Sequence, residues 1–261
     1  ILLCPGYRTH KAQTLSMLVF LWRAGYNVLS FEYYGHGAAV GTRVTLGHRE
    51  QDDFFGALAY SKQRAPRTRI GVLAYSMGAA VALLCSAQAP EVEALVADSA
   101  FATHMSAVQY NIRHTLHLPA CAPGRWIANW IGWCGDHLLG WLIGYRFHQV
   151  EPVRAIAHLA PRPLLLIHGD QDHMVDPQDA FLLQSAAGAA TELWMVPGVD
   201  HCGAYFAERA HYSARVVAFF DRHLRQPERD AFSLHDPPIY TRKQPYRLNA
   251  PRCFSADILA P

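Results

Sequence analysis

Short apolar runs alternate along most of the chain with longer segments in which apolar residues recur at helical spacing. Runs of Val, Leu and Ile bounded by Gly, Pro or Asp are typical of strands, and apolar positions three or four residues apart are typical of helices. The pattern predicts strands at 1–4, 27–33, 69–76, 92–100, 162–170 and 191–198. It predicts helices at 12–25, 48–64, 77–89, 177–188 and 202–224.

The predicted strands are apolar at almost every position, and this indicates how the sheet is covered. A strand with one face in water alternates apolar and polar residues, whereas a continuously apolar strand needs cover on both faces. The regular alternation of strand and helix favours parallel pairing. We therefore predict an α/β fold with a doubly wound, mostly parallel sheet and helices on both faces.

Residues 101–150 break this alternation, since they contain no clear strand and are rich in tryptophan. They lie between two predicted core strands. We interpret them as a helical cap inserted into a core formed by 1–100 and 151–224, with 225–261 as an extended Pro- and Arg-rich tail. The tryptophans of the predicted cap are Trp126, Trp130, Trp133 and Trp141.

A membrane-spanning helix is the competing interpretation of residues 126–147. Asp136, His137 and several glycines interrupt this segment, and its unbroken apolar runs are shorter than the roughly 20 residues that a span needs. We therefore expect no integral membrane span.

Composition narrows the class of protein further. The 261 residues are 51% hydrophobic and 17% charged, which is typical of a globular domain, and the net charge of +2 gives no strong field for nucleic acid. The six cysteines show no C-x-x-C spacing, so we predict neither a metal nor another cofactor. Whether Cys121 and Cys134 form a disulfide bond stays open.

The chain opens directly on an apolar strand rather than on a signal peptide. We expect it to be a fragment whose upstream strand or targeting segment is absent, and we expect a cytoplasmic location. The oligomeric state is open.

Ser76 stands between a predicted strand and a predicted helix, with no residues left over for a loop. Such a tight turn forces strained backbone angles and requires small neighbours, here Ala74 and Gly78. It places the hydroxyl at the carboxyl end of the strand and at the start of a helix, where developing negative charge is stabilised. We interpret Ser76 as a nucleophile, against the alternative of a small residue inside a core helix.

A serine hydroxyl needs a base, and the base an orienting acid. Among fifteen histidines, His201 is distinguished by its place after the last predicted strand and before the last helix. Asp172 follows another strand and is the acid that we favour. Asp170 and Asp98 are competitors, and a capping or turn role is the alternative for any one of them.

Acyl transfer also needs donors for an oxyanion. The backbone N–H of Met77, directly after the nucleophile, is one candidate. The backbone N–H of Tyr7, after the first strand and Gly6, is the other.

The motifs ILLCPGY, SFEYYGHGAAVG, VLAYSMGAAVA, LLLIHGDQDHMVDP and VPGVDHCGAYF, in this order, resemble the α/β-hydrolase family, in its esterase and serine-peptidase-like branch. The resemblance covers roughly residues 1–224. It implies Ser76 as nucleophile, Asp172 as acid and His201 as base, with Met77 and Tyr7 as oxyanion donors. Ala74 replaces the first glycine of the usual G-x-S-x-G, and Pro5-Gly6 replaces the common His-Gly.

These observations lead us to expect a serine hydrolase that cleaves a carboxylic ester of a small-molecule acyl substrate. A peptidase or aminoacyl-amide hydrolase, or a thioesterase, using the same residues is the alternative, and a non-catalytic binding domain is an alternative of another class. The four cap tryptophans either line an apolar substrate pocket or form a small core of the cap.

Overall fold

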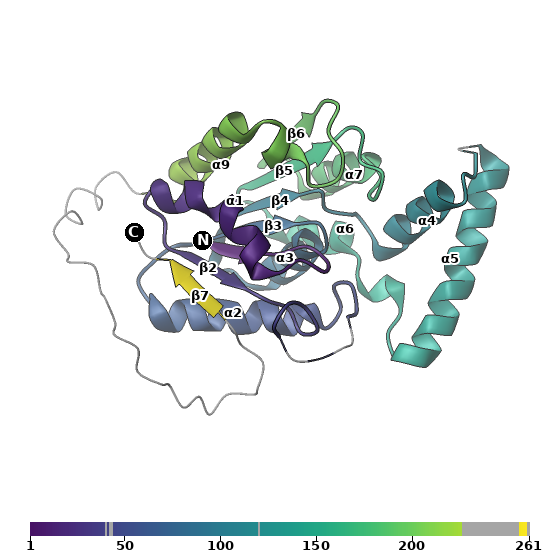
Figure 1. Cartoon of the computed structure of the whole chain (residues 1–261), viewed down its shortest axis with the longest axis horizontal. Helices are drawn as coiled ribbons and strands as arrows, with labels where there is room; N and C mark the ends of the chain where they lie inside the picture. Colours follow the sequence, from purple (N-terminus) through teal and green to yellow (C-terminus); the bar gives the residue numbers. More distant parts are fainter. Residues whose placement is uncertain (40, 42–43, 120, 226–255, 260–261) are drawn as a thin grey trace.

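The computed structural model describes residues 1–39, 41, 44–119, 121–225 and 256–259. One sheet with helices on both sides forms the body of the molecule, and two helices project from one end (Figure 1). The strands are β1 (Leu2–Cys4), β2 (Val28–Phe31), β3 (Ile70–Tyr75), β4 (Val92–Asp98), β5 (Leu164–Gly169), β6 (Thr191–Val196) and β7 (Ala256–Leu259).

The strand order is β6-β5-β4-β3-β1-β2-β7. Every neighbouring pair is parallel except β2 with β7, which is antiparallel. Every residue of β3 and of β5 is buried, as their continuously apolar sequences predict. The predicted fold class, a mostly parallel doubly wound α/β sheet, is therefore confirmed.

Helices follow most strands and cover the sheet. They are α1 (Lys11–Arg23), α2 (Glu50–Arg64), α3 (Met77–Gln88), α4 (His104–Thr115), α5 (Ala122–Ile143), α6 (Pro152–Ala155), α7 (Gln178–Ala187), α8 (Ala204–Ala207) and α9 (Arg209–Leu224), with short 3-10 turns at Phe147–Gln149 and Ile156–Leu159. The helix expected at 202–224 is thus two helices. They separate at Glu208, whose ψ of 52° lies outside the helical range.

Successive strand residues point to opposite faces and divide the core in two. Val72 packs with Phe54 of α2 and with side chains of α3 and α7 on one face. Leu73 packs with Leu21 of α1 and Phe220 of α9 on the other. The two layers hold the carboxyl ends of the strands at one edge of the sheet, where loops carry the candidate site residues.

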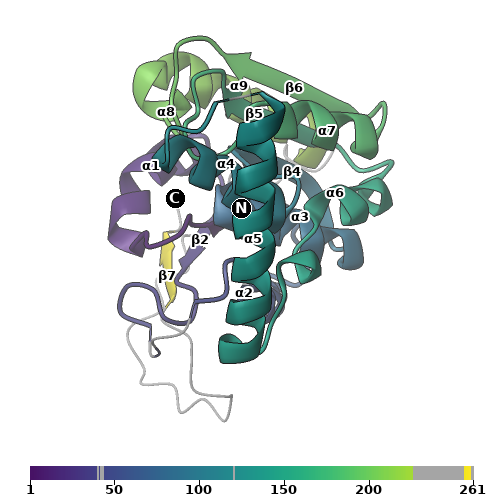
Figure 2. The ribbon, with the colours of Figure 1, turned by 90° about the vertical axis from the view of Figure 1, so that its right-hand side faces the viewer.

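Helices α4 and α5 lie side by side beyond this edge, and α5 runs along the outside of the molecule (Figures 1 and 2). They pack closely because Gly132 of α5 has no side chain. A Cβ there would lie 3.2 Å from Gln109 and 3.3 Å from Met105 of α4. The strand-free segment predicted at 101–150 consists of these two helices and a 3-10 turn.

The predicted tail at 225–261 falls largely on residues 226–255 and 260–261, which lie outside the described residues. The exception is β7, which extends the sheet beside β2. Within the described part of the chain, no helix is both long enough and apolar enough to cross a membrane. Cys121 and Cys134 are free thiols.

Candidate active site

Ser76 occupies the bend between β3 and α3, at the carboxyl edge of the sheet. Its φ of 51° and ψ of −121° are strained values for a residue with a side chain. Its backbone N–H donates to the carbonyl of Asp98 on β4 at 2.8 Å, which holds the bend against the sheet. Strand, bend and helix therefore hold the hydroxyl of Ser76 in a fixed place.

Gly78 allows α3 to begin directly against the end of β1. A Cβ at Gly78 would lie 2.3 Å from the carbonyl oxygen of Pro5 and 2.6 Å from that of Cys4. Backbone atoms cannot move aside as a flexible side chain can, so only glycine fits this close approach. The requirement for a small residue after the predicted nucleophile thus has a steric cause.

His201 joins the hydroxyl of Ser76 to a carboxylate. Its Nε2 lies 2.7 Å from Ser76 Oγ, and its Nδ1 lies 2.7 Å from Asp172 Oδ2. An ionised carboxylate can only accept, so Nδ1 carries the proton and Nε2 is free to accept from the serine hydroxyl. The three residues that the sequence singled out are therefore brought together in a continuous hydrogen-bonded chain.

Asp172 is buried and has donors on both carboxylate oxygens. The backbone N–H groups of Met174 and Val175 each donate to Oδ1 at 2.8 Å. Burial alone would raise the pKa of Asp172, but hydrogen bonds from His168 and His201, with that of Val175, hold this pKa well below its ordinary value. The carboxylate is therefore ionised throughout the neutral range.

The two competing acids have other partners. Asp170 Oδ1 accepts from the backbone N–H of Gly198 at 2.6 Å. Asp98 Oδ2 accepts from the hydroxyl of Tyr212 at 3.0 Å, and burial raises the pKa of Asp98 to about 6. Neither carboxylate has a hydrogen bond to His201 among the described contacts, so the geometry favours Asp172.

The predicted oxyanion donors flank Ser76 on two chain segments. Met77 is the first residue of α3, where backbone N–H groups have no partner within the helix. Tyr7 follows Gly6, and a Cβ on Gly6 would lie 3.5 Å from Cβ of Ser76. The loop after β1 therefore passes directly beside the serine.

His168 was not among the residues that sequence reasoning selected. It lies on β5, is buried, and places its Nε2 3.2 Å from Asp172 Oδ2, the oxygen that also faces His201. The same Nε2 lies 3.4 Å from the carbonyl oxygen of Val175, so both neighbours accept and Nε2 carries the proton. Its position four residues before Asp172, inside an apolar strand, was the available signal.

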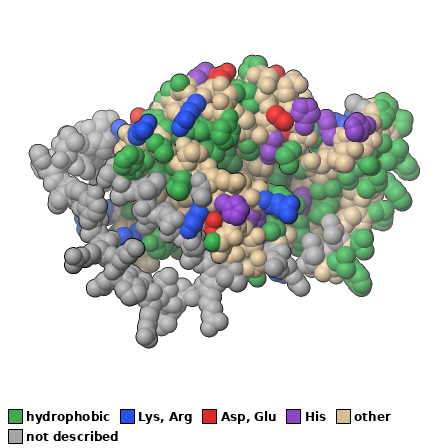
Figure 3. Space-filling view, viewed as in Figure 1, with side chains coloured by type: hydrophobic (Ala, Val, Ile, Leu, Met, Phe, Trp, Pro, Cys, Tyr) green, Lys and Arg blue, Asp and Glu red, His purple; other side chains and the backbone are tan. Residues whose placement is uncertain are grey.

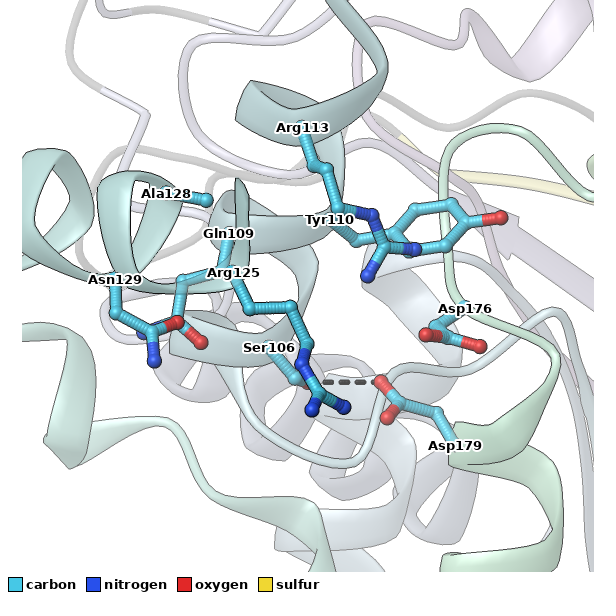
Figure 4. A pocket seen from close by; sticks show the side chains of 9 residues that line it. All are labelled: Ser106, Gln109, Tyr110, Arg113, Arg125, Ala128, Asn129, Asp176 and Asp179. Carbon is cyan, nitrogen blue, oxygen red and sulfur yellow. Dashed lines mark hydrogen bonds between the residues drawn. The ribbon is translucent and has the colours of Figure 1, made fainter. Parts of the chain in front are cut away.

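A polar cavity of about 140 Å³ lies between α4, α5 and the loop that follows Asp172. Figure 4 shows Arg113 and Arg125 entering it from the two helices, with Asp176 and Asp179 on the other side. Tyr110 also lines it, and the Tyr110 hydroxyl donates to the backbone carbonyl of Asp172 at 2.9 Å. The cavity therefore adjoins the segment that carries the acid.

The four tryptophans that we expected in a pocket or in a small core do not line this cavity. Their exposed fractions range from 56% to 81%, which is inconsistent with a core of the helical segment. Their assignment to a substrate pocket stays a prediction. The four side chains with these exposed fractions are Trp126, Trp130, Trp133 and Trp141. Hydrophobic side chains also gather over α5 in the space-filling view (Figure 3).

The parallel sheet and the hydrogen-bonded Ser76–His201–Asp172 chain at its carboxyl edge define the class of protein as an α/β hydrolase. Residues 1–137 match the Hydrolase_4 family, described as serine aminopeptidase, S33. The match covers more than half of the chain, and the chain belongs to this family.

One relative matches over most of this chain. The chain is 26% identical over 212 residues to the uncharacterized protein YfhR of Salmonella typhimurium, a match covering 76% of this chain and 63% of YfhR. The chain therefore spans less than two thirds of the length of this relative.

Two esterases share the fold. The structure of the Pyrococcus furiosus esterase Pf2001 is 22% identical, with a TM-score of 0.68, over 86% of this chain and 83% of that chain. The structure of Est1E from Butyrivibrio proteoclasticus, which has ferulic acid bound, is 18% identical, with a TM-score of 0.61, over 85% of this chain and 88% of that chain. The family match and the shared fold place the chain among the α/β hydrolases.

Proposed function

We propose that the protein is a serine hydrolase that cleaves a carboxylic ester through an acyl-enzyme on Ser76. The observation that carries this proposal is the pair of 2.7 Å hydrogen bonds that connects Ser76 Oγ through His201 to Asp172. A strained serine with a base at hydrogen-bond distance, and an acid behind that base, is the arrangement that nucleophilic acyl transfer requires.

In the first half-reaction, Ser76 Oγ attacks the carbonyl carbon of the ester while its proton moves to Nε2 of His201. Asp172 stabilises the imidazolium that forms and keeps its own charge. The tetrahedral intermediate collapses when the bond to the alcohol oxygen breaks, and His201 gives the proton to the leaving alcohol. The products of this half-reaction are the acyl-enzyme and free alcohol.

In the second half-reaction, water attacks the acyl carbonyl as His201 takes one of its protons. The second tetrahedral intermediate expels Ser76 Oγ, which recovers a proton from His201, and the carboxylic acid leaves. We assign the backbone N–H groups of Met77 and Tyr7 as donors to the oxyanion of both intermediates. The position of Met77 at the start of α3 and the approach of Gly6 to Ser76 support this assignment.

We also propose that 101–150 act as a cap over a core of 1–100 and 151–224. Two hydrogen bonds support a cap linked to the catalytic loop. The Tyr110 hydroxyl donates to the carbonyl of Asp172, and Asn111 Nδ2 donates to the carbonyl of Met174. In such a cap, α4 and α5 limit which acyl or alcohol groups reach Ser76.

An amide of an amino acid is the second candidate substrate, because the matching family is described as serine aminopeptidase, S33. A thioester is the third. A panel of p-nitrophenyl esters of increasing acyl length, aryl esters, thioesters and aminoacyl p-nitroanilides distinguishes them. We expect the highest kcat/KM on an ester, and a preference for the anilides would assign the peptidase activity instead.

The nucleophile is tested on the best substrate of that panel. We expect Ser76→Ala to lower kcat by at least about 10⁴-fold, because loss of the nucleophile leaves only binding and oxyanion stabilisation. Ser185→Ala, on the exposed surface of α7, is the matched control and keeps full activity. Equal activity of Ser76→Ala and wild type would refute the mechanism, and inactivity of wild type on every substrate would favour a binding domain.

A further inference from the structure

The dipeptide Asp98–Ser99, at the carboxyl end of β4, contacts all three elements that carry the proposed catalytic residues. The backbone carbonyl of Asp98 accepts from the N–H of Ser76 at 2.8 Å. The backbone N–H of Ser99 donates at 2.8 Å to the carbonyl of Ile167 on β5, the strand that leads to the acid. The hydroxyl of Ser99 accepts at 3.0 Å from the backbone N–H of Cys202, the residue directly after the base.

The contact with Cys202 differs from the other two because a side chain makes it. The Ser99 hydroxyl donates to Asp98 Oδ1 at 3.0 Å, and the Tyr212 hydroxyl donates to Asp98 Oδ2 at 3.0 Å. The carboxylate thus takes the proton of the Ser99 hydroxyl and leaves a lone pair of its oxygen for the N–H of Cys202. The orientation of the hydroxyl is therefore fixed by Asp98.

Both residues joined by the Ser99–Cys202 hydrogen bond have left-handed backbone angles. The φ of Ser99 is 54° and the φ of Cys202 is 53°. Residues with a side chain rarely adopt such angles, and they keep them where surrounding contacts hold them in place. Strain of this kind clusters at functional sites, so the hydrogen bond is a candidate part of the site rather than an ordinary loop contact.

The hydrogen bond holds the chain at the residue that follows His201. The imidazole must keep both of its 2.7 Å contacts, one with Asp172 Oδ2 and one with Ser76 Oγ. On the other side, Asp200 Oδ1 accepts from the backbone N–H of His201 at 2.7 Å, but the Asp200 side chain is 64% exposed. Water can replace an exposed acceptor, whereas Ser99 is fully buried and its hydroxyl is out of reach of water.

We propose that Ser99 is a positioning residue whose hydroxyl holds the loop of His201, so that the imidazole stays between Asp172 and Ser76. The proposal rests on the proposed function, because it concerns the geometry of the same three residues. Ser99 acts on the reaction through His201 and touches no substrate. Since small displacements of a catalytic group lower the rate strongly, loss of the hydroxyl lowers kcat rather than raising KM.

Two variants remove the hydroxyl and differ in their backbone preference. Ser99→Ala keeps the cost of a positive φ, whereas Ser99→Gly removes it. We expect both variants to lower kcat by about 10- to 100-fold with KM nearly unchanged. We expect Ser99→Gly to unfold about 2–4 °C above Ser99→Ala. A purely structural role predicts instead that activity follows stability, with Ser99→Gly clearly the more active variant.

Reaction with a fluorophosphonate measures the activation of Ser76 independently of the choice of substrate. We expect the second-order rate constant for labelling to fall in both Ser99 variants by the same factor as kcat. The downfield proton NMR signal of the His201 Nδ1–H, which is bonded to Asp172, should also shift or broaden in both variants. Loss of stability alone would leave this signal unchanged in the folded protein.

Ser86→Ala is the matched control. Ser86 is as fully buried as Ser99, and its hydroxyl has no hydrogen-bond partner among the described residues. It lies on α3, the helix that begins directly after Ser76. We expect Ser86→Ala to react with the fluorophosphonate at the wild-type rate.

Two results would overturn the proposal while leaving the proposed hydrolase standing. One is labelling of both Ser99 variants at the wild-type rate, and the other is activity that follows the melting temperature of the two variants. Failure of folded wild type to react at all would overturn the proposed hydrolase, and the role of Ser99 with it.

Discussion

Two imidazoles share one oxygen of Asp172. His201 Nδ1 lies 2.7 Å from Oδ2 and His168 Nε2 lies 3.2 Å from the same atom. His201 must turn its other nitrogen to Ser76, so the direction of the Asp172 carboxylate decides whether that nitrogen reaches the hydroxyl. We regard His168 as a positioning residue that acts on the reaction through Asp172.

The His168 role predicts that His168→Phe lowers kcat by about 10- to 100-fold, because small misplacement of a catalytic group has effects of this size. His168→Gln keeps an N–H donor and should retain most of the activity. A merely structural role would instead make the two variants equally active, or would lower activity only in proportion to lost stability.

The His168→Phe variant should also change how the free energy of unfolding depends on pH. The folded pKa of Asp172 lies below its unfolded value, so its ionised form stabilises the protein above the unfolded pKa, and this stabilisation is lost as pH falls. His168→Phe removes a donor and raises the folded pKa toward the unfolded value. Asp172 then contributes less stability above the unfolded pKa, and the loss of that stability as pH falls is smaller and ends at a higher pH than in wild type. Urea unfolding between pH 3 and pH 7 measures this shift (the unfolded pKa is about 3.9).

The assignment of Asp172, rather than Asp98, as the acid behind His201 gives a second prediction for single residues. Asp172→Asn removes the negative charge behind His201 and allows the wrong tautomer, so kcat should fall by about 10⁴-fold. Asp98→Asn should stay within about tenfold of wild type, because Asp98 bonds to Tyr212 rather than to His201. The reverse order of the two variants would show that Asp98 is the acid.

At the scale of elements, the bend between β3 and α3 was predictable and the surroundings of the acid were not. The position of Ser76 follows from local sequence, since no loop residues separate the strand from the helix. The choice among Asp98, Asp170 and Asp172 depends on how separate loops meet in space. His168 was missed because a histidine within an apolar strand resembles a buried structural residue until its neighbour is known.

The bend depends on the packing of α3 against β1. Gly78→Ala would put a Cβ 2.3 Å from the carbonyl oxygen of Pro5, so we expect it to lower the free energy of unfolding by about 3 kcal/mol and to reduce kcat. Gly135→Ala in α5 is the control, since no atom lies within 4 Å of its Cβ. It should raise the free energy of unfolding by about 0.5–1 kcal/mol, because alanine favours the helix. Equal effects in urea unfolding would contradict the steric argument.

At the scale of the whole molecule, the sheet and its helices could be predicted because continuously apolar strands demand cover on both faces. The placement of α4 and α5 relative to the sheet was harder to predict from the sequence. A periodic pattern shows that α5 has a tryptophan stripe, but it does not show whether that stripe faces a core, a pocket or solvent. The structure leaves these tryptophans more than half exposed, which argues against a core of the helical segment, and their assignment to a substrate pocket stays a prediction.

The account as a whole depends on Ser76 being an activated nucleophile. The most direct measurement is reaction of the folded protein with a fluorophosphonate, followed by fragmentation of the tryptic peptide 70–113, which also contains Ser86, Ser99 and Ser106. The account predicts one adduct, on Ser76, that is lost in His201→Ala and in denatured protein. An adduct on another serine, or no adduct on folded wild type, would contradict it.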